Sequence, residues 1–244
     1  MQVVLKTKCI LMTREYIALF FSVIFCPMLL LIFGMVYGNE PSPMMGGNGT
    51  VDVMLPSFAG LIFAGTGFIS MPVAVASCRE RGELRRYMMT PLHPMVFLLC
   101  DMVMYFAISV IGMLIVLAIG FFGYDCSFDG SWWLLIYGFT ISGISMFSIG
   151  LLIASLSKNS KVAQTVGMIV GFPMMFLSGA SIPIEMMPDT MENVTRFMPL
   201  SYCVSLMRDV WDGAAFSGLM NDSLVLLAVA VVFLLLTAVT FRWE

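Results

Sequence analysis

Long apolar runs alternate with short polar segments along the whole chain. A helix needs about 20 consecutive apolar residues to cross the hydrocarbon core of a bilayer. Six runs approach or exceed this length, and Asp101 is the only charged residue within them. The runs are residues 17–36, 53–77, 95–122, 132–155, 162–180 and 224–241. We therefore predict an all-α membrane protein with six transmembrane helices in one domain, residues 1–244.

Composition supports lipid as the solvent for much of this chain. Hydrophobic residues make up 60% of the sequence and charged residues 11%. A typical soluble domain has about 45–50% apolar and about 25% charged residues. A soluble core could not hide this much apolar surface, so the lipid bilayer is an expected partner, and we expect no nucleic-acid partner.

The positions of lysine and arginine predict the orientation in the membrane, because basic residues concentrate in cytoplasmic loops. With six spans, ten of the twelve basic residues fall on one side. The other two, Arg196 and Arg208, lie in the loop before the last span. We therefore expect a multi-pass protein of the plasma (inner) membrane with both termini in the cytoplasm.

Two polar segments on the cytoplasmic side suggest amphipathic helices. The first fourteen residues mix Val3, Leu5 and Ile10 with basic residues, which is typical of an interfacial helix; an ordinary basic tail is the alternative. In residues 79–88, Leu84 and Tyr87 fall on one helical face, and Thr90-Pro91 would end the helix. This segment is either a short surface helix or a loop that only obeys the positive-inside rule.

The loop of residues 181–222 is too long for a simple turn. Leu200, Val204, Met207 and Trp211 are spaced as on one helical face, and Gly213 follows as a stop signal. We predict short re-entrant or interfacial helices here, with Trp211 suited to a membrane interface. A folded lid without substrate contact is the alternative.

Small, acidic and thiol side chains add three hypotheses. Gly167 and Gly171 form a GxxxG pattern in the fifth run, which favours close helix packing in lipid. Asp101 is a functional candidate because intramembrane charges are rare, although its place near a helix end would let it reach water. Cys126 and Cys203 both fall on the predicted outer side, where a disulfide is conceivable but not established by sequence.

Three stretches, taken together and in order, resemble the permease subunits of type-2 ABC transporters. They read ERGELRRYMMTPL, IGLLIASLSKNSKVAQTVG and FLSGASIPIEMMPDTMENVTRFMPLSYCVSLMRDVW, and the likeness covers nearly the whole chain with its six spans. The resemblance implies the transmembrane subunit of an ATP-binding-cassette exporter. It also implies a homodimer, or a heterodimer with a related permease, driven by a separate ABC ATPase subunit.

The resemblance also implies roles for particular residues. Residues 79–91 would form the coupling helix that docks on the ATPase, although Glu83 stands where the family usually has threonine. The coupling residues would be Glu80, Arg81, Gly82, Leu84, Arg85, Thr90 and Pro91. The outer gate over the transport route would include Ser178, Gly179, Pro183, Pro188, Pro199 and Arg208.

Missing motifs narrow the function further. The chain has no GxxxxGK[ST] phosphate loop, so we expect ATP and magnesium on the partner subunit and no cofactor in this chain. His93 is the only histidine, and we predict neither a metal site nor a catalytic site. The chain is thus expected to be a permease and not an enzyme. The alternative is a membrane scaffold or accessory subunit, and the substrate could be a drug, a lipid, a glycan or a peptide.

Overall fold

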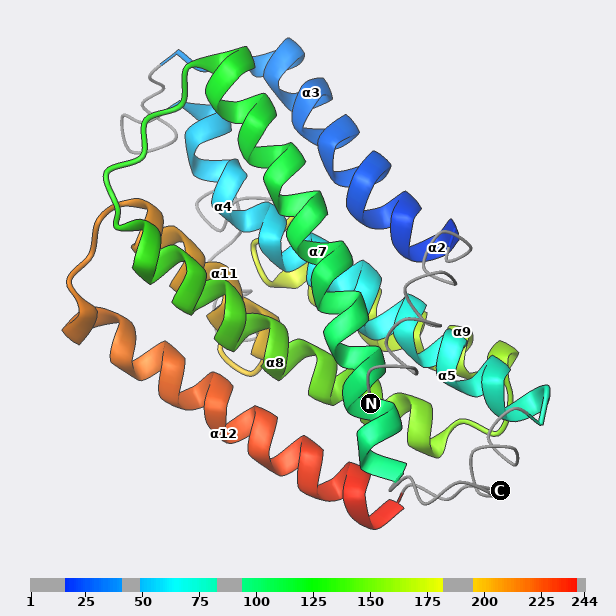
Figure 1. The fold of residues 1–244 in the computed structure, drawn as a ribbon. Coiled ribbons are helices and arrows are strands. Elements are labelled where there is room, and N and C mark those ends of the chain that lie inside the picture. The colour runs from blue at the N-terminus through cyan, green and yellow to red at the C-terminus, as the bar shows by residue number, and fades with distance from the viewer. Residues whose placement is uncertain (1–15, 41–48, 83–93, 182–194, 241–244) are drawn as a thin grey trace.

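The computed structural model describes residues 16–40, 49–82, 94–181 and 195–240, and the regular elements of these residues are helices (Figure 1). Six of them are long and apolar enough to cross a membrane, which confirms the predicted fold class. These spans are Phe20–Tyr37, Thr50–Glu80, Val96–Tyr124, Trp132–Leu156, Ser160–Leu177 and Phe216–Thr240.

Each predicted run corresponds to one of these spans, and two of the spans are built from consecutive elements. The first consists of α2 (Tyr16–Leu19), η1 (Phe20–Phe25) and α3 (Cys26–Tyr37). The second consists of α4 (Thr50–Phe63), η3 (Ala64–Ser70) and α5 (Met71–Glu80). The others are α7 (Pro94–Tyr124), α8 (Trp132–Leu156), α9 (Ser160–Leu177) and α12 (Phe216–Thr240).

The last helix differs from its predicted bounds. It begins at Phe216, well before the predicted start at residue 224. Asn221 and Asp222 interrupt the apolar run, but both are compatible with a helix, so hydropathy underestimates the helix length. The predicted amphipathic helix over residues 1–14 lies outside the described residues.

Each π-helical segment, η1 and η3, ends two residues before a proline. Pro27 occupies the first turn of α3 directly after η1, and Pro72 occupies the first turn of α5 directly after η3. Proline has no backbone N–H, so a carbonyl oxygen in the preceding turn loses the hydrogen bond that it would otherwise accept. Widened turns are a usual response where the helical hydrogen-bond ladder is interrupted. In η3, Ser70 Oγ donates a further hydrogen bond to the carbonyl oxygen of Gly65 at 2.9 Å.

The second span is the central helix of the bundle. In its most hydrophobic 18-residue stretch, 89% of the residues are buried, against 22% in the corresponding stretches of the fifth and sixth spans. It contacts α3, α7, α8, α9 and the short helix α11 (Pro199–Trp211). Glycines allow α8 and α9 to pack closely against η3. A Cβ atom on Gly150 of α8 or on Gly167 of α9 would collide with a carbonyl oxygen of η3.

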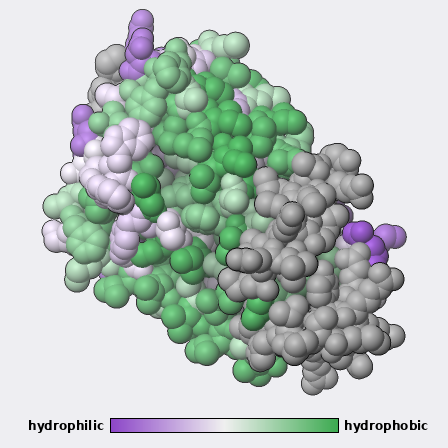
Figure 2. Space-filling view, in the orientation of Figure 1, coloured by the Kyte–Doolittle hydropathy of each residue, from purple (hydrophilic) through white to green (hydrophobic). Residues whose placement is uncertain are grey.

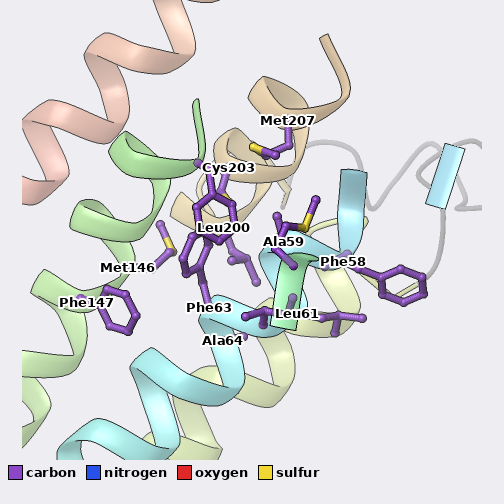
Figure 3. Packing of buried hydrophobic residues seen from close by; sticks show 14 of the residues in the cluster. Phe58, Ala59, Leu61, Phe63, Ala64, Met146, Phe147, Leu200, Cys203 and Met207 are labelled. Atoms are coloured by element: carbon purple, nitrogen blue, oxygen red, sulfur yellow. The ribbon is translucent and has the colours of Figure 1, made fainter. Parts of the chain in front are cut away.

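Helix α11 lies in the core and not on the surface. Leu200, Cys203 and Met207 of α11 are buried in the same apolar cluster as Phe63 of α4 and Met146 of α8, and Figure 3 shows Leu200 and Cys203 beside Phe63. The predicted helical spacing is therefore confirmed. The interface role predicted for Trp211 is wrong within this chain, because this side chain is only 2% exposed. Its ring stacks on Phe121, with ring centroids 5.9 Å apart, and is tilted against Phe128, with ring centroids 4.9 Å apart.

The surface between the two ends of the bundle is apolar. Figure 2 shows hydrophobic side chains over the middle of one face and hydrophilic ones toward its edges. Exposed large apolar side chains lie on α3, α7, α9 and α12. In water such a surface would be unfavourable, whereas lipid tails solvate it. The chain is a multi-pass membrane protein.

Candidate functional site

The end of the second span contacts the turn between α8 and α9. Arg79, in the last turn of α5, donates from Nη1 to the carbonyl oxygen of Ser157 at 2.7 Å, and the carbonyl oxygen of Ala154 lies 3.5 Å away. These carbonyls end α8, where the last four lack helical partners and carry partial negative charge. The guanidinium group therefore caps α8 from a neighbouring helix.

Glu80 makes a second contact with the same turn. Its Oε2 accepts a hydrogen bond of 2.7 Å from Ser160 Oγ, at the first residue of α9. A carboxylate is favourable near a helix N-terminus because the helix dipole is positive there. Asn159 caps the same helix end by accepting from the backbone N–H of Val162 at 2.8 Å. We call the Arg79–Ser157 and Glu80–Ser160 contacts the α5 latch.

The backbone turns sharply directly after the α5 latch. Gly82 adopts a φ of +68°, and its N–H donates to the carbonyl oxygen of Arg79 at 3.0 Å. A Cβ atom there would meet no atom of the described residues within 4 Å, so among these residues the glycine serves the backbone conformation and not a close approach. Arg81 is exposed and donates to Ser77 Oγ at 2.7 Å from Nη2 and at 3.2 Å from Nε.

This geometry corrects one expectation about residues 79–88. Arg79 and Glu80 are the last residues of the second span, and the helix ends at Glu80. A continuous surface helix beginning at Arg79 is therefore wrong, because the positive φ of Gly82 interrupts it. The remaining coupling candidates, Leu84, Arg85, Thr90 and Pro91, lie outside the described residues.

At the opposite end of the bundle, gate candidates gather against α4. Ala180, which follows Ser178 and Gly179, and Leu200, which follows Pro199, both lie within 4 Å of a Cβ atom built on Gly60. Ser178 is fully buried and Gly179 has a φ of +82°. One turn away on α4, Ser57 Oγ accepts a hydrogen bond of 2.8 Å from Arg208 Nε. Pro183 and Pro188 lie outside the described residues.

Acidic side chains surround Arg208 at this end. Burial raises the pKa of Asp209 above its ordinary value, and the charges of Asp222 and Asp212 raise it further, while Arg208 lowers it. Burial also raises the pKa of Asp212, which Arg208 lowers and Asp129 and Asp52 raise. The pKa of each carboxyl group is raised because the cost of burying its charged form outweighs the attraction of the Arg208 guanidinium group.

Cys126 and Cys203, whose pairing the sequence left open, are not bridged, since both thiols are free and buried. Cys126 accepts from Asn39 Nδ2 at 3.9 Å. Burial raises the pKa of each thiol to about 12. Neither thiol is therefore a reactive thiolate at neutral pH.

Asn39 and Asp52 were not identified from the sequence as structural residues. Asn39 Nδ2 donates to Asp52 Oδ2 at 3.2 Å and to the carbonyl oxygen of Tyr124 at 3.1 Å. The backbone N–H of Ser127 donates to Asp52 Oδ1 at 3.2 Å. Together they connect the ends of α3, α4 and α7 that lie opposite the α5 latch. The only sequence signal was an acid in the first turn of a helix, where the dipole favours it.

The remaining sequence candidates lie between the two ends. Gly171 of α9 approaches the Phe68 side chain, where a Cβ atom would lie 3.5 Å from the phenylalanine Cβ. Asp101 is 9% exposed, in the third turn of α7. Gly167 and Gly171 therefore lie where α9 packs closely on η3.

Comparisons with known proteins agree with this architecture. Residues 39–239 match the model of a family described as ABC-2 family transporter protein. The chain is 28% identical over 189 residues to the probable multidrug ABC transporter permease YbhS of Escherichia coli strain K12, covering 77% of this chain and 48% of YbhS. It is 28% identical over 158 residues to the corresponding permease YbhR, covering 65% of this chain and 43% of YbhR.

A third relative comes from another organism. Nodulation protein J of Rhizobium leguminosarum bv. viciae is 26% identical over 115 residues, covering 46% of this chain and 44% of that protein. The chain spans about half the length of the relatives that it matches. Because the family model covers most of the sequence and six spanning helices accompany it, this chain belongs to the ABC-2 family of transporter permeases.

Proposed function

We propose that this chain is the transmembrane subunit of an ATP-binding-cassette exporter driven by a separate ATPase subunit. Family membership and the six spans support this proposal. Two copies, or this chain and a related permease, enclose the route, and ATP and magnesium bind the partner. The names of the E. coli relatives make a drug the first substrate class to test, with a lipid, a glycan or a peptide as alternatives.

The α5 latch is the observation that best supports coupling to a partner. The proposed docking segment follows Gly82 in the sequence, and the side chains of Arg79 and Glu80, at the end of the central helix, each contact the α8–α9 turn at 2.7 Å. A displacement of that segment by an ATPase would therefore move three helices and not one. Since the central helix also contacts α11, the same movement would reach Ser57 and Arg208 at the far end.

Charge reversal of Arg81 and Arg85 tests the docking surface. We expect Arg81→Glu with Arg85→Glu to insert normally, to lose co-purification with the ATPase subunit and to abolish dye efflux. Loss of a buried interfacial charge pair costs about 2–5 kcal/mol. Arg196→Glu, at an exposed residue of the loop before α11, is the matched control and should retain both properties.

The efflux result separates the alternatives. Normal efflux by the double reversal, at equal expression, would contradict the coupling role of this segment. A wild-type chain that binds the ATPase but moves none of the substrate classes would instead indicate a scaffold or accessory subunit. The permease purified alone should show no ATP hydrolysis, and robust hydrolysis would contradict the proposed division of labour.

Reporter fusions test the orientation. The described basic residues Arg79, Arg81, Lys158 and Lys161 lie on or beside the α5 latch, whereas Asp52, Asp129 and Asp212 lie near the opposite end. We expect fusions at Glu40 and Asp125 to report the outside, and fusions at Arg86 and Lys158 to report the cytoplasm. A single inverted result among the four would overturn the proposed topology.

A further inference from the structure

An apolar groove runs along the outside of α9. It has a volume of about 450 Å³ and lies between α8, α9 and α12. Helix α9 contributes one residue per turn, Val162, Val166, Val170 and Met174, and Phe233 lines the side formed by α12. All its lining side chains except that of Ser157 are apolar. The groove is open, since Val162 is 41% exposed and Val166 is 37% exposed.

The groove has the length of one lipid acyl chain. From Val162 to Met174 the helix rises about 18 Å at 1.5 Å per residue. Half of the hydrocarbon core of a bilayer is about 15 Å thick. The groove begins at the end of α9 that carries the α5 latch and stops near the start of α11 at Pro199. Its axis therefore follows the direction of an acyl chain in a single leaflet.

Two lysines flank the mouth of the groove. Lys158 follows Ser157 and Lys161 precedes Val162, and both lysines are exposed, while Ser157 and Val162 line the groove. The positive end of the α9 dipole lies at the same place. An acid also lies at this turn: Glu80, at the end of α5, accepts a hydrogen bond from Ser160 Oγ. Basic side chains beside a gap between transmembrane helices are the feature that binds anionic lipid headgroups.

We propose that this groove binds one acyl chain of an anionic phospholipid, whose phosphate contacts Lys158 and Lys161. The bound chain fills the space between α9 and α12. It thereby supports the turn that Arg79 and Glu80 hold from the other side. The site needs no ATPase and no transported substrate, so it stands or falls independently of the proposed transport function.

Native mass spectrometry of the purified permease, with phosphatidylglycerol and phosphatidylcholine supplied in equal amounts, tests the headgroup contact. We expect the wild-type chain to retain phosphatidylglycerol preferentially. Lys158→Gln and Lys161→Gln should each reduce that preference by roughly fivefold, since one basic residue near a membrane surface contributes about 1 kcal/mol. Lys158→Arg with Lys161→Arg should preserve the preference, and Arg196→Gln is the control at a distant basic residue.

A tryptophan pair tests the acyl-chain contact. Val166→Trp fills the groove and should reduce retention of both lipids, whereas Ile169→Trp, at a 66% exposed residue of the same helix outside the groove, should not. Equal retention of the two lipids by the wild-type chain would overturn the proposal. An unchanged preference in both Lys→Gln variants, or equal retention in the two tryptophan variants, would also overturn it.

Discussion

Arg79 Nη1 donates a 2.7 Å hydrogen bond to the backbone carbonyl oxygen of Ser157, across 78 residues of sequence. Ser157 is the residue that follows the last turn of α8. The bond joins a cation to a helix C-terminus, where both the missing hydrogen-bond donor and the helix dipole favour it. Because the same guanidinium group also approaches Ala154, one side chain holds the central helix to the end of α8.

We therefore expect Arg79→Gln to destabilise the permease. Hydrogen bonds to charged groups contribute about 1.5–3 kcal/mol when their partners are buried, and the shorter glutamine amide cannot replace two contacts. Arg79→Lys should recover only part of the loss, because an ammonium group lacks the planar fork of donors. Melting temperatures of the purified variants provide the measurement.

Arg81→Gln is the matched control for this prediction. Arg81 is exposed and its guanidinium group bonds to Ser77 in the preceding turn of the same helix, where exposed interactions contribute little. Its melting temperature should change much less than that of Arg79→Gln. Equal decreases in the melting temperatures of the two variants would show that the contact of Arg79 with Ser157 stabilises the fold no more than an exposed contact does.

Gly82 provides a test of backbone conformation. Its φ of +68° disfavours residues with a Cβ atom, and the left-handed region costs roughly 1–2 kcal/mol for an L-residue. Gly82→Asn should be the best tolerated substitution because asparagine enters this region more readily than other residues. We expect efflux and ATPase co-purification to fall in the order Gly, Asn, Ala, Val. Equal activity for Asn and Val would exclude a conformational cause.

The six spans could be predicted because an apolar run of about 20 residues is typical of a membrane-crossing helix and rare in soluble proteins. Hydropathy could not show that the second span is the central helix, since lipid and protein interior both favour apolar side chains. It also could not show that Trp211 is a core residue, because an aromatic residue suits a membrane interface and a buried aromatic cluster equally well. Which neighbour covers a side chain depends on tertiary packing.

The α5 latch was only partly visible in the sequence. Glu80 was predicted as a coupling residue from the family resemblance, but Arg79 was not. The partner of Arg79 is a backbone carbonyl, which every residue type offers, so no sequence pattern identifies Ser157. Gly82 was predicted as a coupling residue from the same resemblance, whereas its positive φ depends on a turn that composition does not specify.

The acids near Arg208 predict a pH dependence. The pKa of Asp209 is raised in the folded chain, mainly by burial. At pH values between the ordinary pKa of about 4 and this raised pKa, the folded chain therefore binds more protons than the unfolded chain. Stability from this group is therefore greatest at low pH and decreases as pH rises through the folded pKa. We expect Asp209→Asn to raise the melting temperature at neutral pH, with little change near pH 4. A lower melting temperature at neutral pH would contradict this sign.

Two helical glycines predict opposite effects of one substitution. A Cβ atom on Gly167 of α9 would collide with the carbonyl oxygen of Phe68, whereas one on Gly218 of α12 meets nothing within 4 Å. Gly218→Ala should therefore stabilise the permease by about 0.4–1 kcal/mol, because alanine has less conformational freedom to lose on folding. Gly167→Ala should destabilise it, since backbone cannot move aside as a flexible side chain can. Melting temperatures that shift in the same direction would show that α9 does not pack on η3 as closely as the structure indicates.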